Sequence, residues 1–131
     1  MRNYQCKKKN PYLLPHNVYM QALYLIRDYD RLKGEYNRLL YTSAPPHDGQ
    51  PTGKGGIGRP VEVKAIMLSE IDSKMRIIEN AINQIPKYYR SGVWNNVVHG
   101  VRYPADADMR TYRTYKQRFI YNVAKGMTFV T

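Results

Sequence analysis

The chain has 131 residues, of which 43% are hydrophobic and 24% are charged, and its formal net charge is +11. This composition is typical of one small globular unit or two, and it excludes an intrinsically disordered chain. So basic a balance indicates a polyanion as the partner, with nucleic acid ahead of a membrane surface.

The sequence predicts neither a membrane span nor a signal peptide. Its longest apolar run is far too short to cross a bilayer, and no apolar secretory segment follows the basic N-terminus. Cys6 is the only cysteine, which excludes an intramolecular disulfide and a cysteine-rich zinc site. A single cysteine fits a reducing compartment, so we expect a cytoplasmic protein.

The charge is unevenly distributed along the sequence. Residues 1–14 carry a net +4 and residues 86–131 a net +6, so these two segments hold ten of the eleven charges. Lys7, Lys8 and Lys9 fit equally well a solvated tail and an arm that lies along phosphates. The pattern predicts a nearly neutral scaffold, a basic working unit and a basic N-terminal arm over residues 1–14.

The first predicted helix begins near Pro15 and covers residues 15–41. Apolar residues recur in it at alternating spacings of four and three, which is the a/d repeat of packed helices. Three apolar residues lie outside this repeat: Leu23, Ile26 and Leu40. Their side chains could form a contact between two copies of the chain, so a homodimer is an open alternative. The members of the repeat are Val18, Ala22, Leu25, Tyr29, Leu32, Tyr36 and Leu39.

The next segment, residues 42–60, holds four prolines and five glycines, which predicts a flexible loop. Its stretch GQPTGKGG, residues 49–56, resembles a phosphate-binding loop, but the spacing is wrong and no strand precedes it, so we interpret it as linker. The second predicted helix covers residues 61–85, repeats the a/d pattern and ends at Pro86. The two helices together predict a long antiparallel hairpin over residues 15–85.

The last third of the chain predicts two shorter helices. The first covers residues 87–98 and is ended by Gly100. Asp108 is a good N-cap for the second, which should cover residues 109–125. No strand is expected anywhere outside residues 129–131, so the predicted fold class is all-α.

The final predicted helix is amphipathic and basic. At 3.6 residues per turn, Tyr112, Tyr115, Phe119 and Val123 share one arc that should pack against a core. Lys116 falls on the same arc and would have to extend its stem to reach water. The opposite arc and its shoulder hold no carboxylate. Their members are Arg110, Arg113, Thr114, Gln117, Arg118, Tyr121 and Lys125.

A cationic face without carboxylates suits phosphate contacts, and Arg and Gln can also read base edges in a major groove. Two helices in which the second is basic on its exposed side predict a C-terminal helix-turn-helix over residues 86–131. We expect the outward residues of its first two turns to reach base edges, and Arg118 and Lys125 to meet phosphates. The connector before Asp108 is longer than the standard turn, and a solvated basic face is the alternative.

Two stretches outside the loop resemble small transcriptional regulators of phages and prophages of Firmicutes, and the family they suggest is the RinA-like late-gene activators. The stretches are YLLPHNVYMQALYLIRDYDRLKGEY and IPKYYRSGVWNNVVHGVRYPADADMRTYRTYKQRFIYNVA. The resemblance implies a helix-turn-helix like that of sigma-factor region four, with residues 87–98 supporting and residues 109–125 recognising DNA. It also implies activation of phage late or packaging genes in a bacterial host cell, with RNA polymerase as a further partner.

Two other functions stay open at this point. One is an interaction protein whose basic face binds a large enzyme, such as RNA polymerase or a foreign nuclease. The other is a packaging protein resembling a small terminase subunit, which would form a ring.

No catalytic site, metal site or cofactor is expected from the sequence. His16, His47 and His99 are far apart and lack the neighbouring cysteines or carboxylates of a metal site. Asp106 and Asp108 suit a connector and a helix cap better than a nuclease metal pair. The serines lack the surroundings of a nucleophile. We therefore expect a protein that binds and does not catalyse.

Overall fold

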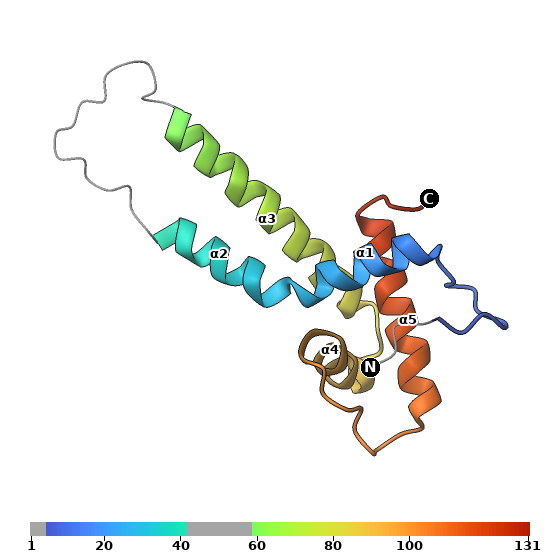
Figure 1. Cartoon of the computed structure of the whole chain (residues 1–131). Coiled ribbons are helices and arrows are strands. Elements are labelled where there is room, and N and C mark those ends of the chain that lie inside the picture. The colour runs from blue at the N-terminus through green and yellow to red at the C-terminus, as the bar shows by residue number, and fades with distance from the viewer. Residues whose placement is uncertain (1–4, 42–58) are drawn as a thin grey trace. The chain divides into compact units, whose positions relative to one another are not determined.

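The computed structural model describes residues 5–41 and 59–131, so the predicted flexible loop 42–60 lies almost entirely outside its described part. The described residues are all-α, as predicted, and they contain no strand, not even at residues 129–131. No helix among these residues is both long and apolar enough to cross a membrane. The helices in Figure 1 are α1 (His16–Arg27), α2 (Tyr29–Tyr41), α3 (Arg59–Asn83), α4 (Lys87–His99) and α5 (Met109–Gly126).

The chain divides into two compact units, one formed by Met1–Tyr29 with Arg76–Thr131 and the other by Asp30–Met75. This division differs from the predicted boundaries after residues 14 and 85, because α1 and the end of α3 belong with α4 and α5. The first unit has fourteen basic and four acidic residues, which gives a net charge of +10. The second unit has seven basic and six acidic residues, which gives a net charge of +1. Nearly all the charge therefore belongs to the first unit.

The prediction of one helix over residues 15–41 is wrong, because the chain leaves the helix at Asp28, between α1 and α2. Asp28 has φ −88° and ψ 2°, and its N–H donates to the carbonyls of both Tyr24 and Leu25 at 3.1 Å. Asp is a poor interior helix residue because its short side chain competes for backbone hydrogen bonds. The a/d spacing continues across the interruption, so the pattern alone does not reveal it.

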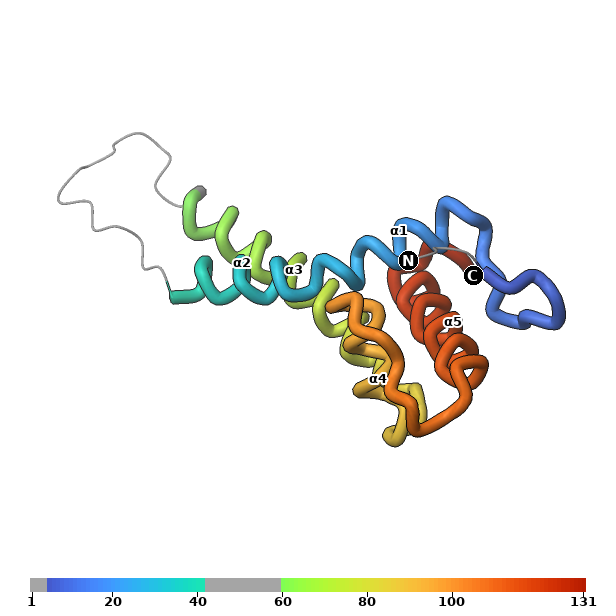
Figure 2. The backbone as a smooth tube through the Cα atoms, turned by 60° about the horizontal axis from the view of Figure 1, so that its bottom comes forward, coloured from blue at the N-terminus to red at the C-terminus, as the bar shows by residue number. Residues whose placement is uncertain are grey.

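In the first unit, α1, α4 and α5 all pack against one another (Figure 2). The end of α3 joins the same unit, where the Asn122 side chain donates to the Ala81 carbonyl at 3.4 Å. Burial of large apolar side chains from α1, α4, α5 and the end of α3 supplies most of the stabilisation of such a core. Its fully buried members include Leu23, Ile26, Ile78, Ile85, Val93, Phe119, Ile120 and Val123.

This core corrects the expectation that Leu23 and Ile26 could contribute to a homodimer. Both side chains are 0% exposed, so neither can contact another molecule. They were left over from the a/d repeat because α1 is enclosed by more than one neighbour and needs a wider apolar stripe. Leu40, the third residue of that expectation, is exposed.

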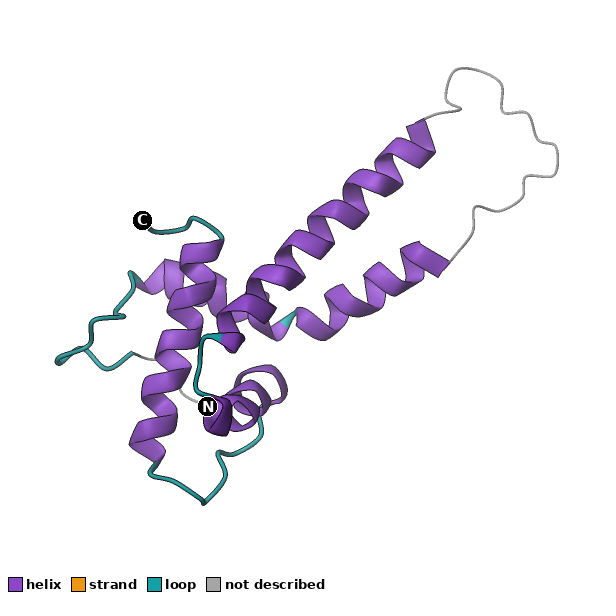
Figure 3. Ribbon diagram, turned by 180° about the vertical axis from the view of Figure 1, so that it is seen from behind, coloured by secondary structure: helices purple, strands orange, loops and turns teal. Residues whose placement is uncertain are grey.

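The second unit contains α2 and the first part of α3, which run in opposite directions (Figure 3). The segment that would join them as a hairpin falls in residues 42–58, outside the described part. Leu32 is buried, but much of the apolar surface further along both helices is not. The exposed large apolar side chains here are Leu40, Tyr41, Val61, Val63, Ile66 and Met67.

The predicted helix α4 ends as expected at Gly100, whose φ of 68° places it in the left-handed region that favours glycine. Within α4, Gly92 allows a close approach of the backbone to its neighbours. A Cβ on Gly92 would lie 2.6 Å from Cε1 of Tyr112 and 2.8 Å from Cδ of Pro104. The close packing of α4 against α5 and their connector thus depends on the absence of a side chain at Gly92.

Gly92→Ala should destabilise the protein by about 1–3 kcal/mol, because the clash with two ring side chains outweighs the better helix propensity of alanine. Gly34→Ala is the matched control, since a Cβ on Gly34, within α2, has nothing within 4 Å. It should leave stability unchanged or raise it by about 1 kcal/mol. Chemical denaturation measures both, and equal stabilisation by the two substitutions would contradict the close approach.

Candidate nucleic-acid interface

Helix α5 begins as predicted at its Asp108 cap, whose Oδ1 accepts a hydrogen bond from the Arg110 N–H at 3.0 Å. The predicted core arc is confirmed for Tyr112 and Phe119, which are 1% and 0% exposed. The Tyr112 ring stacks on the Tyr103 ring at 5.1 Å between centroids. These contacts fix the rotation of α5 about its axis and hence the direction of its polar side chains.

The placement of Gln117 on the outward face of α5 is wrong. Gln117 is 8% exposed, and its Nε2 donates to Gln5 Oε1 at 2.8 Å and to the Tyr12 carbonyl at 2.6 Å. The N-terminal segment covers this position, which a wheel of the helix alone cannot anticipate. Gln117 therefore cannot reach a base edge while the segment is in place.

The N-terminal segment, residues 5–14, is folded and does not trail as an open arm. Gln5 holds it closed, because its Oε1 accepts from the Leu14 N–H and its Nε2 donates to the Leu14 carbonyl, both at 2.8 Å. Asn10 adds a bond from its Nδ2 to the Cys6 carbonyl at 2.7 Å. The two side chains convert the predicted arm into a loop of defined shape.

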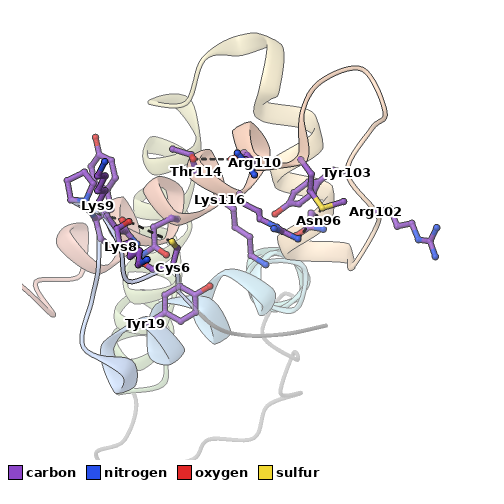
Figure 4. Close-up of a pocket in the computed structure, with 16 residues that line it drawn as sticks. Cys6, Lys8, Lys9, Tyr19, Asn96, Arg102, Tyr103, Arg110, Thr114 and Lys116 are labelled. Atoms are coloured by element: carbon purple, nitrogen blue, oxygen red, sulfur yellow. Dashed lines mark hydrogen bonds between the residues drawn. The ribbon is translucent and has the colours of Figure 1, made fainter.

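A cleft with a volume of about 970 Å³ opens between this loop and the first half of α5. We call it the cationic cleft. In Figure 4, Lys8 and Lys9 lie on one side of it, Asn96 and Tyr103 on the other, and Tyr19 and Lys116 between them. The lining residues are Cys6, Lys8, Lys9, Asn10, Pro11, Tyr12, Tyr19, Asn96, Arg102, Tyr103, Met109, Arg110, Arg113, Thr114, Lys116 and Gln117.

Six of these lining residues are cations, and no carboxylate is among those that the structure describes. The acidic residues closest in sequence to the first turns of α5 are Asp106 and Asp108, and both accept hydrogen bonds from other groups. Asp106 accepts a hydrogen bond from the Tyr112 hydroxyl at 2.6 Å, and Asp108 caps α5. The charge of the cleft is therefore not balanced by carboxylates in its own wall.

The cations of the cleft affect one another. Burial lowers the pKa of Lys116, and the positive charges of Arg27 and Arg113 lower it further. Because an opposite charge would raise this pKa again, an anion in the cleft favours the charged ammonium. The site is thus electrostatically prepared for an anion.

The cleft brings together several of the predicted site residues. Arg110, Arg113, Thr114 and Gln117 line it from α5, and Lys8 and Lys9 line it from the N-terminal loop. Two segments that are about a hundred residues apart in the sequence thus form one surface.

Three other predicted residues do not line the cleft. Lys7 and Lys125 are exposed elsewhere, and Arg118 is half-buried with its guanidinium 5.9 Å from the centre of the Tyr12 ring. The Tyr12 ring also meets Tyr121 edge-on at 5.2 Å. The N-terminal loop therefore packs on the outward face of α5 beyond its second turn.

The lining residues that sequence reasoning missed include Tyr19, Arg102, Tyr103 and Lys116. Lys116 carried a signal, because a lysine on the apolar arc of a helix lies beside either solvent or a polar site. Tyr19 and Tyr103 carried none, since tyrosines are frequent throughout this chain. The side chain of Arg102 extends away from the other labelled residues (Figure 4).

The connector between α4 and α5, residues 100–108, is longer than the turn of a standard helix-turn-helix. Its shape comes from the capped end of α4, where the Val101 carbonyl accepts a bond from the Asn96 side chain at 2.9 Å. Among the described residues, no group of three or more His, Cys, Asp or Glu is placed to hold a metal ion. Comparisons with protein-family models, curated proteins and solved structures found no match to this chain.

Gln117→Ala should lower the free energy of unfolding by about 1–3 kcal/mol, because the half-buried Tyr12 carbonyl loses its donor and Gln5 Oε1 keeps only the Leu14 N–H. It should also speed hydrogen exchange at the Leu14 N–H, which Gln5 then holds less firmly. Thr114→Ala is the control, since the Thr114 hydroxyl bonds only to the Arg110 carbonyl one turn back. If both variants unfold at the same denaturant concentration, Gln117 does not hold the loop.

Proposed function

We propose that this protein is a double-stranded DNA-binding transcription regulator that holds the phosphate backbone in the cationic cleft. One observation carries the proposal: six cations from the N-terminal loop, the connector and α5 line a single cleft with no carboxylate among its described residues. Phosphates of a duplex offer regularly spaced negative charge, and neutralising them releases counterions. Binding without catalysis is part of the proposal.

The exposed part of α5 supports contact with a duplex. Met109, Arg110, Arg113 and Thr114 are exposed in its first two turns, whereas the N-terminal loop and the core cover much of the rest. Recognition helices enter the major groove by their N-terminal part. On this model Arg110, Arg113 and Thr114 read bases, and Gln117 positions the loop that carries Lys8 and Lys9.

Arg118 and Lys125 keep their proposed role as phosphate contacts outside the cleft. The regulatory role itself, the phage setting and RNA polymerase as a further partner are proposed on the resemblance to RinA-like activators alone. The bacterial cytoplasm follows from the same resemblance.

Arg110→Ala and Arg113→Ala should each cost about 1–3 kcal/mol on the preferred DNA site and relax its sequence preference, since each removes a base contact and a charge. The preferred site is first selected from a random duplex pool, and affinities are then measured by fluorescence anisotropy at several salt concentrations.

Lys87→Ala is the matched control for these variants, because it removes an exposed cation from the start of α4, outside the cleft. Its affinity should stay within about threefold of the unmodified protein, a surface effect of about 0.5 kcal/mol. Equal losses in all three variants would mean that net charge alone attracts DNA. No loss in any of them would favour the interaction protein.

We also propose a second copy of this chain as the partner of the second unit. Val63, Ile66 and Met67 are exposed within one 100° sector of α3, at 100° per residue. The unit has a net charge of only +1, so two copies would meet there without strong repulsion. A dimer would fit a DNA-binding protein that reads repeated half-sites.

Ile66→Glu should convert the dimer to a monomer in light scattering, because a buried, unpaired carboxylate in the interface is costly. Val61→Glu is the control, since Val61 lies 140° around the same helix from Ile66. A monomeric unmodified protein at high concentration would contradict the dimer without affecting the DNA proposal.

A further inference from the structure

Four polar side chains from three elements line the cationic cleft: Tyr19 from α1, Tyr103 from the connector, and Arg113 and Lys116 from α5. Figure 4 shows Tyr19, Tyr103 and Lys116 around it. We call these four side chains the floor of the cleft, and electrostatic effects link three pairs of them. Burial raises the pKa of Tyr103 to about 12, the Arg113 guanidinium opposes this rise, and the Tyr19 hydroxyl adds to it. Arg113 also lowers the pKa of Lys116.

Three of the four groups, Tyr19, Tyr103 and Lys116, are held in place by the fold. Tyr19 is 2% exposed and belongs to the core of the first unit. Tyr103 is fixed by its stack on Tyr112, and Lys116 is half-buried on the inner side of α5. Side chains that are fixed before binding lose less conformational entropy when a ligand arrives.

All four groups donate hydrogen bonds at neutral pH. Arg and Lys side chains can only donate. Burial also raises the pKa of Tyr19, so both phenols keep their protons. A ligand that matches this floor carries negative charge and several acceptor oxygens, which describes a phosphate group.

We infer that the floor of the cationic cleft is a seat for one phosphate group, bound by Lys116 and by the hydroxyls of Tyr19 and Tyr103, with the positive charge of the Arg113 guanidinium beside it. The inference rests on the proposed function and deepens it, because the phosphate is a phosphodiester of the DNA backbone with its two free oxygens. Lys8 and Lys9, which also line the cleft, contact the phosphates on either side of this one.

The test compares three single substitutions. Lys116→Met removes the ammonium and keeps a stem of similar length. Tyr103→Phe removes only the hydroxyl and keeps the ring that stacks on Tyr112. Lys87→Met is the control, an exposed lysine outside the cleft. Denaturation midpoints first confirm that the variants are folded.

Two ligands are titrated into each variant. Duplex DNA without terminal phosphates, followed by anisotropy over a range of salt, reports on the backbone phosphodiester. Inorganic phosphate, followed at constant ionic strength by the NMR signals of the Lys116 side chain in the proteins that keep it, reports on the seat alone. Sodium chloride in place of phosphate shows the effect of salt.

Lys116→Met should weaken duplex binding by about tenfold and reduce the salt slope by about one unit, as the loss of one phosphate contact does. Tyr103→Phe should weaken binding by about two- to tenfold, the loss of one neutral hydrogen bond, with the slope unchanged. Inorganic phosphate should saturate the Lys116 signals of the unmodified protein and of Lys87→Met.

The outcomes separate the seat from the proposed function. Unchanged duplex affinity in Lys116→Met and Tyr103→Phe, with no saturable phosphate effect, overturns the seat even if Arg110→Ala still weakens DNA binding. Saturable phosphate binding that Tyr103→Phe weakens, in a protein that does not bind duplex DNA, supports the seat and overturns DNA as the source of its phosphate. If Lys87→Met also loses duplex affinity and saturable phosphate binding, both properties depend on net charge, and the seat is overturned.

Discussion

One buried amide, the side chain of Gln117, holds together the surface on which the proposed function depends. It donates to Gln5 Oε1 and to the Tyr12 carbonyl, and Gln5 in turn closes the N-terminal loop on Leu14. Each such bond contributes modestly to stability, but leaving the half-buried Tyr12 carbonyl unpaired costs more. The bonds help to place two lysines of the loop opposite the first turns of α5, together with the packing of Tyr12 on Arg118 and Tyr121.

The rotation of α5 is the second constraint. Tyr112, Phe119, Ile120 and Val123 are buried, so the helix cannot turn to present another face without exposing large apolar area. The N-terminal loop then covers the outward side beyond the second turn. What remains open is the N-terminal part of the helix, which carries Arg110 and Arg113 free of any carboxylate in the cleft wall.

Electrostatics connects this arrangement to binding. The first unit has a net +10, and its cations crowd within a cleft where burial and like charge lower the pKa of Lys116. Like charges in a partly buried site destabilise one another, and a bound polyanion relieves that cost. On the proposed function, binding of DNA would relieve part of this repulsion.

Much of the fold could be predicted from the sequence, and the candidate site only in part. The ends of α4 and α5 follow from local signals, Gly100 and the Asp108 cap, which act within one turn of chain. The interruption at Asp28 keeps the a/d spacing and so leaves no trace in the pattern. Gln117 was placed outward because a helical wheel contains no distant segment, and the loop that buries it comes from the other end of the chain. The convergence of Tyr19 and Tyr103 at the cleft is likewise a tertiary event.

The central claim is that the cationic cleft is where DNA binds, and mapping by NMR tests it most directly. The backbone amide signals of the unmodified protein would be followed while its selected duplex is added. The account predicts that the largest shifts fall in residues 8–12, 102–103 and 109–117, with small shifts in α2 and the first part of α3. Shifts concentrated in residues 30–41 and 59–75, with the cleft unchanged, would contradict it.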